Sequence, residues 1–207
     1  MSTLKTNKLV HTANGASEFT LPQTDGSAGQ FMKTDGSGNL AFATVATGVD
    51  GITMCDTWVV TTSFNSGGEF LTNDWSRQQT PATHYGGFGS AMTESSGVFT
   101  FPSNGHYYVE STISGYANGG ARSYIGNVHY YSTNSGGSYS ESVKGYTSGY
   151  ADSAHWSITI SDIYDVTSFS TARWKMKFES SGLNNVFGST SGNIGLTGVR
   201  FIRLGDT

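Results

Sequence analysis

From residue 53 onward, apolar and polar residues alternate in short runs, and each run ends in a cluster of Gly, Asn or Ser. No segment repeats apolar residues at the i, i+3, i+4, i+7 spacing that would give a helix one apolar face. Short alternating runs separated by turn residues are typical of the strands of a β-sandwich or barrel. The runs that we predict as strands are residues 53–62, 97–101, 106–116, 122–132, 138–147, 155–166, 172–180 and 194–204. The sequence therefore predicts an all-β protein.

The composition indicates an ordered chain and excludes two kinds of partner. Aromatic residues make up 13% of the 207 residues, and such large side chains build a core, so disorder is excluded. The net charge is -4, and no basic run would neutralise a row of phosphates, so we expect no nucleic-acid partner. The longest apolar run, residues 40–46, is too short to cross a bilayer, so we expect no membrane insertion. Cys55 has no second cysteine to pair with, and no signal peptide is apparent, so we expect a soluble protein made in a reducing cytoplasm.

A short repeat occupies the amino-terminal part. TDGSAGQ at 24–30 returns as TDGSGNL at 34–40, with few apolar residues nearby. A turn–strand unit of this size buries too little to be stable alone, so we interpret the repeat as a stalk that folds when identical chains wrap round one axis. The alternative is a flexible linker of polar turns. Residues 1–50 contain no Trp, Tyr or Cys, and we predict a virion-attachment and stalk segment at 1–50 followed by a globular head at 51–207.

Residues 97–115, GVFTFPSNGHYYVESTISG, resemble the G-x-F-x-x-P-x-x-G-x-Y-x-[FV] stretch of the tumour necrosis factor and complement globular-head superfamily. The matching residues are Gly97, Phe99, Pro102, Gly105 and Tyr107. Residues 193–204 resemble the last strand of that family, with Gly198 kept but with Val199 and Arg200 in place of its aromatic–leucine pair. The resemblance covers roughly residues 52–204 and implies an antiparallel jelly-roll β-sandwich that assembles as a homotrimer.

Residues 29–42 are similar to G-Q-x-L-x-T-D-G-x-G-x-L-x-[FW] segments at the start of bacteriophage fibre proteins. The matching residues are Gly29, Gln30, Lys33, Thr34, Asp35, Gly36, Gly38, Asn39, Leu40 and Phe42. Together the two resemblances imply a homotrimeric fibre of a tailed phage, made in the host cytoplasm and carried on the virion. Residues 1–50 would bind other virion proteins, and the head would bind a glycan or protein of the host cell surface. The alternative is a capsid decoration or head-fibre protein with a mainly structural role, which the small size of the chain favours.

Two sets of residues are candidates for the contacts of such a fibre. The trimer-interface candidates are Phe31, Leu40 and Phe42 in the stalk and Tyr107, Tyr124, Trp174 and Phe201 in the head. For each ring of the head, burial within its own sandwich is the alternative. Tyrosines set among Ser, Gly and Asn at 130–156, and the aromatic residues at 73–90, have the composition of antibody contact loops. The receptor-binding candidates are Trp75, Tyr85, Tyr139, Tyr146 and Tyr150, and the alternative is that these rings simply alternate between core and surface.

The sequence shows no arrangement typical of a catalytic or metal site. The nearest string to a G-x-S-x-G nucleophile motif, GSTSG at 188–192, has Thr at its centre. Five scattered histidines and one cysteine show no metal-ligand spacing, and DGSGN at 35–39 lacks the alternating oxygen ligands of a calcium loop. Asp162 and Asp165 would lie on opposite faces of a strand, which separates them as a carboxylate pair. We expect no enzymatic activity, no metal and no cofactor.

Overall fold

The computed structural model describes residues 6–10, 18–44, 51–72, 74–77, 87–188 and 196–207. These residues form strands and turns, and none of these segments forms a helix long and apolar enough to cross a membrane. The chain divides into two compact units, Met1–Gly48 and Val49–Thr207, and each is described by itself. The predicted boundary after residue 50 falls beside this division.

The first unit contains two short antiparallel pairs, β1 with β2 and β3 with β4. Its strands are β1 (Lys8–Val10), β2 (Glu18–Thr20), β3 (Gln30–Thr34) and β4 (Leu40–Thr44). The second TDGS copy makes the turn between β3 and β4. In this turn one carboxylate oxygen of Asp35 accepts hydrogen bonds from the backbone N–H groups of Ser37 (2.7 Å) and Asn39 (3.0 Å). The first copy instead precedes β3, so the two copies of the repeat have different structures.

The β3–β4 hairpin separates the apolar residues that we predicted for a stalk interface. In its register Met32 lies opposite Phe42. Side chains opposite one another share a face and neighbours along a strand alternate, so Leu40 and Phe42 lie on one face and Phe31 on the other. The Phe42 ring packs against Gly26, whereas Phe31 is 45% exposed. The role of these three residues in a trimer interface stays a prediction.

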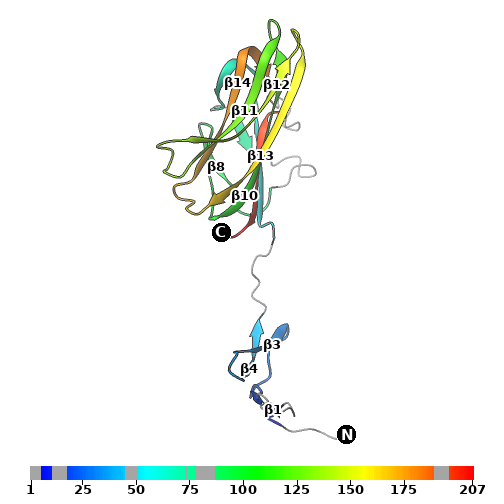
Figure 1. Ribbon diagram of the computed structural model, residues 1–207, viewed down its shortest axis with the longest axis vertical. Coiled ribbons are helices and arrows are strands. Elements are labelled where there is room, and N and C mark those ends of the chain that lie inside the picture. The colour runs from blue at the N-terminus through cyan, green and yellow to red at the C-terminus, as the bar shows by residue number, and fades with distance from the viewer. Residues whose placement is uncertain (1–5, 11–17, 45–50, 73, 78–86, 189–195) are drawn as a thin grey trace. The chain divides into compact units, whose positions relative to one another are not determined.

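The second unit is a sandwich of two antiparallel layers (Figure 1). Its strands are β5 (Met54–Val60), β6 (Phe64–Phe70), β7 (Trp75–Arg77), β8 (Thr93–Ser95), β9 (Val98–Thr100), β10 (Gly105–Ala117), β11 (Arg122–Ser132), β12 (Ser140–Gly149), β13 (His155–Val166), β14 (Arg173–Val186) and β15 (Gly198–Gly205). One layer has the order β7-β5-β15-β10-β13, and the other has β12-β11-β14, with β6 and β9 both paired to β14. The layers join where residues 115–117 of β10 pair with residues 184–186 of β14. This arrangement confirms the predicted all-β jelly-roll sandwich.

The two ends of the sandwich are built differently. At one end the backbone N–H of Thr53 donates to the carbonyl of Arg203 (3.3 Å), where β5 begins and β15 finishes. At the other end the turns that follow β10 and β12 meet, because the N–H groups of Gly119 (2.7 Å) and Gly120 (3.2 Å) donate to the carboxylate of Asp152. We call these the entry end and the loop end of the sandwich.

Aromatic side chains fill the space between the layers. The ring of Phe99 lies 5.1 to 5.7 Å, between centroids, from the rings of Trp58, Trp75, Trp174 and Phe201. Most of these pairs meet edge to face, the geometry in which the positive edge of one ring approaches the negative face of the other. The predicted motif residue Phe99 is thus the centre of the core.

Three of the rings predicted for a trimer interface lie in this core. Tyr107, Trp174 and Phe201 are each 0% exposed in the single chain. A side chain with no exposed surface cannot contact another subunit, and this corrects the interface prediction for these three residues. Trp174 alternates along β14 with Arg173 and Lys175, and because successive side chains of a strand point to opposite faces, the ring points inwards.

The glycines of the 97–107 motif are required by the backbone. Gly97 has a φ of 77° and Gly105 a φ of 142°, values that residues with a side chain rarely adopt. A Cβ atom on either residue would overlap a backbone carbonyl oxygen of a neighbouring segment. Tyr107 completes the turn, because its hydroxyl donates a hydrogen bond to the carbonyl of Ser103 (3.0 Å).

Candidate binding face

A cross-strand row of Tyr146, Gly126, Glu179 and Gly68 lies on the outward side of β12, β11, β14 and β6. Gly126 lies opposite both Tyr146 and Glu179, and Glu179 lies opposite Gly68. Large side chains therefore alternate with glycines across four strands, so that a ring can lie over Gly126 on one side of Glu179 and a hollow lies over Gly68 on the other. We call this surface the tyrosine face and define it by Tyr124, Tyr130, Glu141, Lys144, Tyr146, Lys177 and Glu179.

Tyr146 and Tyr124 form a corner on the tyrosine face. The Tyr146 ring covers Gly126, where a Cβ atom would lie 2.5 Å from a ring carbon, so only glycine lets the ring occupy this position. The Tyr124 ring stands at 87° to the Tyr146 ring, with 6.0 Å between centroids. Tyr124 and Tyr146 are 43% and 50% exposed. Together with Glu179 they line a hollow of about 300 Å³.

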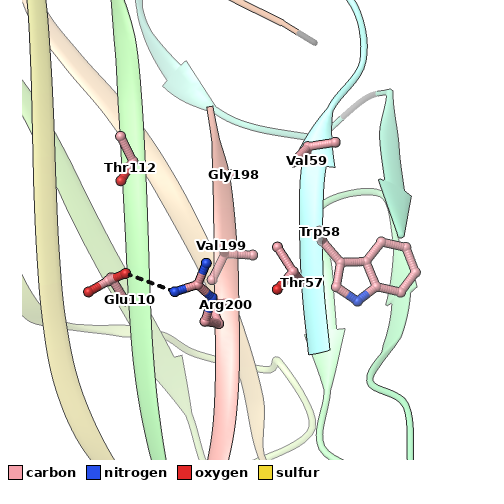
Figure 2. A pocket seen from close by; sticks show the side chains of 8 residues that line it. All are labelled: Thr57, Trp58, Val59, Glu110, Thr112, Gly198, Val199 and Arg200. Atoms are coloured by element: carbon pink, nitrogen blue, oxygen red, sulfur yellow. Dashed lines mark ion pairs between the residues drawn. The ribbon is translucent and has the colours of Figure 1, made fainter. Parts of the chain in front are cut away.

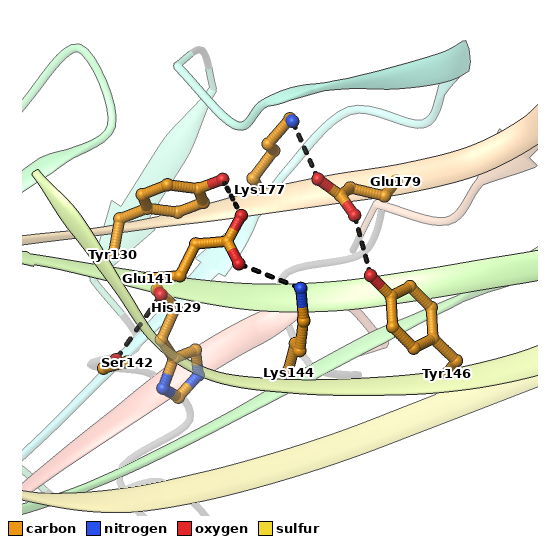
Figure 3. Close-up of polar contacts among 8 residues, drawn as sticks. All are labelled: His129, Tyr130, Glu141, Ser142, Lys144, Tyr146, Lys177 and Glu179. Atoms are coloured by element: carbon orange, nitrogen blue, oxygen red, sulfur yellow. Dashed lines mark hydrogen bonds and ion pairs between the residues drawn. The ribbon is translucent and has the colours of Figure 1, made fainter.

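Glu179 lines both this hollow and a second one, and its contacts with Tyr146 and Lys177 are drawn in Figure 3. One carboxylate oxygen accepts a hydrogen bond from the Tyr146 hydroxyl (3.0 Å), and the other accepts one from Lys177 Nζ (2.8 Å). The second hollow, of about 220 Å³, is lined by Glu179, Lys177, Ser180 and Gly68 among others. A carboxylate and an amine thus lie between two open spaces on the surface.

A second carboxylate–amine pair lies beside the first (Figure 3). Glu141 accepts hydrogen bonds from Lys144 Nζ (3.0 Å) and from the Tyr130 hydroxyl (2.8 Å). These two bonds, the one from Lys144 first, lower the pKa of Glu141. Burial, together with the hydrogen bond to Glu141, raises the pKa of Tyr130 to about 12. Near neutral pH the carboxylate is therefore charged and paired, and the phenol is neutral.

Towards the entry end, the same surface includes Lys175, whose amine lies between two aromatic rings. Lys175 Nζ lies 3.8 Å from the centroid of Phe70 and 3.9 Å from that of Tyr139. An ammonium group over a ring face is attracted by the ring quadrupole. Burial lowers the pKa of Lys175. Tyr139, a predicted receptor-binding residue, thus has its ring covered by a lysine.

The structure brings two of the predicted receptor-binding residues, Tyr139 and Tyr146, onto one side of the sandwich. Tyr150 is 88% exposed and follows β12 at the loop end. Trp75 on β7 is partly buried, and its indole N–H donates to the carbonyl of Leu71 (2.9 Å). Tyr85 lies outside the described residues. Receptor contact stays a prediction for all five candidates.

The outward side of the other layer is the β10–β15 face, which also includes β5 and β13 (Figure 2). On it Arg200 and Glu110 lie opposite one another and form an ion pair of 3.8 Å. Next to this pair Gly198 has no side chain, and a shallow depression of about 110 Å³ lies there between Val59 and Thr112. Among the described residues that line this depression, the only charges, those of Arg200 and Glu110, therefore neutralise each other.

An apolar row crosses the same face. Cys55, Ile202, Tyr108 and Ile163 lie opposite one another on β5, β15, β10 and β13. Ile163 is 57% exposed. Burial raises the pKa of the Cys55 thiol, so the residue stays neutral and adds to the apolar row. The two outward faces of the sandwich therefore differ, because one carries several tyrosines and two neighbouring carboxylate–amine pairs and the other carries an apolar row.

A polar network lies inside the sandwich. His129 Nε2 is 2.6 Å from Ser111 Oγ, its Nδ1 is 3.1 Å from the Tyr164 hydroxyl, and that hydroxyl is 2.5 Å from Ser142 Oγ. A serine hydrogen-bonded to a histidine is the geometry of an activated nucleophile, but Ser111 and His129 are 1% and 0% exposed, which leaves a substrate no access. The network satisfies buried polar groups. Among the residues that the structure describes, no three or more His, Cys, Asp or Glu side chains are grouped to hold a metal ion.

Comparison with known proteins identifies the fold. The sequence matches no protein-family model, and no curated protein matches it. Among solved structures, murine APRIL at pH 5.0 is similar, with 12% identity, a TM-score of 0.53 and coverage of 73% of this chain and 98% of that one. Eiger TNF from S. frugiperda is similar with 12% identity, a TM-score of 0.56 and coverage of 74% and 94%. The second unit therefore has a TNF-like jelly-roll fold, as residues 97–115 predicted.

Proposed function

We propose that this chain is the subunit of a homotrimeric, non-enzymatic virion fibre of a tailed phage, whose head binds a receptor on the host cell surface. The observation that carries the proposal is that a TNF-like sandwich presents two unlike outward faces. The β10–β15 face supplies contacts between subunits, and the tyrosine face supplies contacts with the receptor. One face can then be buried in the assembly while the other stays open.

The β10–β15 face suits contact with further copies of the same chain. Its apolar row includes Ile163, which is more than half exposed in the single chain. Arg200 and Glu110 already pair with each other, so burial of this face leaves neither of these charges without a partner. Closed rings of identical subunits are the usual form of soluble oligomers, and the resemblance to the tumour necrosis factor superfamily favours three copies.

The assignment to a phage particle rests on the amino-terminal unit. Residues 29–42 carry the fibre-like sequence, and the Asp35 turn gives them a defined hairpin. Residues 1–50 would attach the fibre to other virion proteins. Several weak receptor sites on one particle raise the avidity without any single site being strong.

A capsid decoration or head-fibre protein is the second candidate. In that role the amino-terminal segment would bind shell proteins. The fold and the trimer would be the same, and only the location on the particle would differ.

Analytical ultracentrifugation of the full chain tests the trimer. We expect a mass three times the 22.0 kDa of the single chain. Ile163→Lys places a charge in the apolar row and should shift the mass towards the monomer. Leu183→Lys is the matched control, because Leu183 is 56% exposed on β14, away from the β10–β15 face, and Ile163 is 57% exposed. A monomeric wild type, or a trimer that both variants leave intact, would contradict the assigned interface.

Gold-labelled antibody raised against residues 51–207 tests the location on intact virions. Label at the tail or its fibres supports the receptor-binding fibre. Label spread over the capsid supports the decoration protein instead. Absence of label from every virion rejects both.

A further inference from the structure

The corner between Tyr146 and Tyr124 has the geometry of a small binding subsite. The Tyr146 ring forms a floor because it covers Gly126, and the Tyr124 ring forms a wall because it stands at 87° to that floor. The floor is 50% exposed, so part of its surface is open to a ligand. Sites for small molecules combine aromatic surface with a few polar groups that fix orientation, and the hollow here has Glu179 as its polar group.

We propose that this corner binds one neutral pyranose unit of a host-surface glycan. The proposal rests on the receptor-binding function proposed above and names its ligand. The flat C–H side of a pyranose ring packs on the Tyr146 ring, and its edge packs against Tyr124. The apolar side of the sugar thereby leaves water, while its hydroxyl groups stay at the rim of the hollow.

Glu179 supplies hydrogen-bond acceptors at the corner, and Lys177 supplies donors at the second hollow beside it. Each oxygen of the Glu179 carboxylate accepts one hydrogen bond within the protein, from Tyr146 or from Lys177. A carboxylate offers about four acceptor positions, so each oxygen accepts a further bond from a sugar hydroxyl. The ammonium group of Lys177 has three N–H donors, of which one is used by Glu179. Donors and acceptors thus lie side by side, which matches the hydroxyl groups of a sugar.

The charge balance of the surface favours a neutral ligand. Lys177 neutralises Glu179, and Lys144 neutralises Glu141. An acidic sugar would bring a negative charge towards Glu179, and a basic peptide would compete with Lys177 for the same carboxylate. A neutral polyhydroxyl ligand meets neither cost. The second hollow, of about 220 Å³, gives room for the next unit of a glycan chain.

Saturation-transfer difference NMR tests the proposal with the full chain and methyl glycosides of glucose, galactose, mannose and N-acetylglucosamine. We expect at least one glycoside to receive saturation on its ring protons. Tyr146→Ala removes the floor and should weaken the apparent affinity about tenfold or more. Gly126→Ala keeps every polar group but displaces the Tyr146 ring, and it should weaken binding to a similar degree. Phe169→Ala, which removes a 45% exposed ring elsewhere on the head, is the control and should leave binding unchanged.

Two NMR results would overturn the glycan proposal. One is the failure of every glycoside to bind, and the other is binding that Tyr146→Ala and Gly126→Ala leave unchanged. Neither result bears on the proposed trimer or virion location, because ultracentrifugation and gold labelling test those separately. If the full chain adsorbs to the cells that the virion infects, and adsorption survives periodate oxidation of their sugars but not protease treatment, the receptor is a protein and the glycan proposal fails alone.

Discussion

Replacing His129 by Gln tests whether the polar network inside the sandwich limits the stability of the fold in acid. The imidazole is 0% exposed, and its two nitrogens contact the hydroxyls of Ser111 and Tyr164. Burial disfavours the charged ring and lowers the pKa of His129 from 6.5 to about 3. The unfolded chain binds the proton near pH 6.5 and the folded chain near pH 3. The unfolded state therefore holds more protons between these values, and stability falls as the pH falls through this window.

The two pKa values fix the size of the effect. Above pH 7 the contribution of His129 to the free energy of unfolding is constant. Between pH 7 and pH 5 the fold should lose about 2 kcal/mol, and each further unit down to pH 3 should cost about 1.4 kcal/mol more. A glutamine takes up no proton in this range, so the variant should lack this component. It should also be less stable than the wild type at pH 7, because its amide fills less of the space and cannot keep both of the hydrogen bonds that the imidazole makes to Ser111 and Tyr164.

Urea unfolding of both proteins at pH 7 and pH 5 measures the effect. The protein concentration is held fixed, because the stability of an oligomer depends on it. Other titrating groups contribute equally to both proteins, so the difference in stability between wild type and variant isolates His129. This difference should shrink by about 2 kcal/mol at pH 5. Equal losses in the two proteins would refute a buried, neutral His129.

Three substitutions test other parts of the head by urea unfolding. Asp56→Ala removes a fully buried carboxylate that pairs with Arg77, and it should lower the free energy of unfolding by about 3–5 kcal/mol. A loss below about 1 kcal/mol would show that the pair is not buried. Phe178→Ala removes a ring stacked 5.6 Å from Trp156 and should also cost about 3–5 kcal/mol, with an unchanged midpoint as the contradicting result. Gly105→Ala should cost about 1–3 kcal/mol because of its φ of 142°, and wild-type stability would argue against that backbone conformation.

Much of the sandwich could be predicted because short runs rich in apolar and aromatic residues, several of them alternating with polar residues, are bounded by turn residues. Residues 155–166, predicted as one run, are the whole of β13, and residues 122–132 are the whole of β11. β6 was missed because Ser66, Gly67 and Gly68 hide its alternation. The continuation of β14 beyond Ser180 was missed for a related reason. Asn184 lies there fully buried, with its side-chain amide donating to Ser180 Oγ (2.7 Å), and a polar residue in a buried position does not look like a strand in a sequence.

The candidate site was predicted only in part. The composition of residues 130–156 predicts Tyr146 as a binding residue, but it does not point to Glu179 or Gly126. These two residues lie next to Tyr146 only because β12, β11 and β14 pair in this register. The subunit-interface role of Tyr124 stays a prediction, and in the single chain its ring stands at 87° to that of Tyr146 and lines the hollow. For Trp174 the sequence itself indicates a position in the core. Its basic neighbours along β14 alternate with apolar residues, and that pattern predicts a core ring.

The contact between Thr53 and Arg203 makes the head an exchangeable module. Because β5 begins beside the point where β15 finishes, a different sandwich can replace this one after the amino-terminal unit without rerouting the backbone. The same geometry suits engineering. A peptide or fluorescent tag fused after Thr207 emerges beside the entry strand β5, at the end of the sandwich opposite the turns held by Asp152. Replacement of the head and labelling of the chain would both use these two adjacent strand ends.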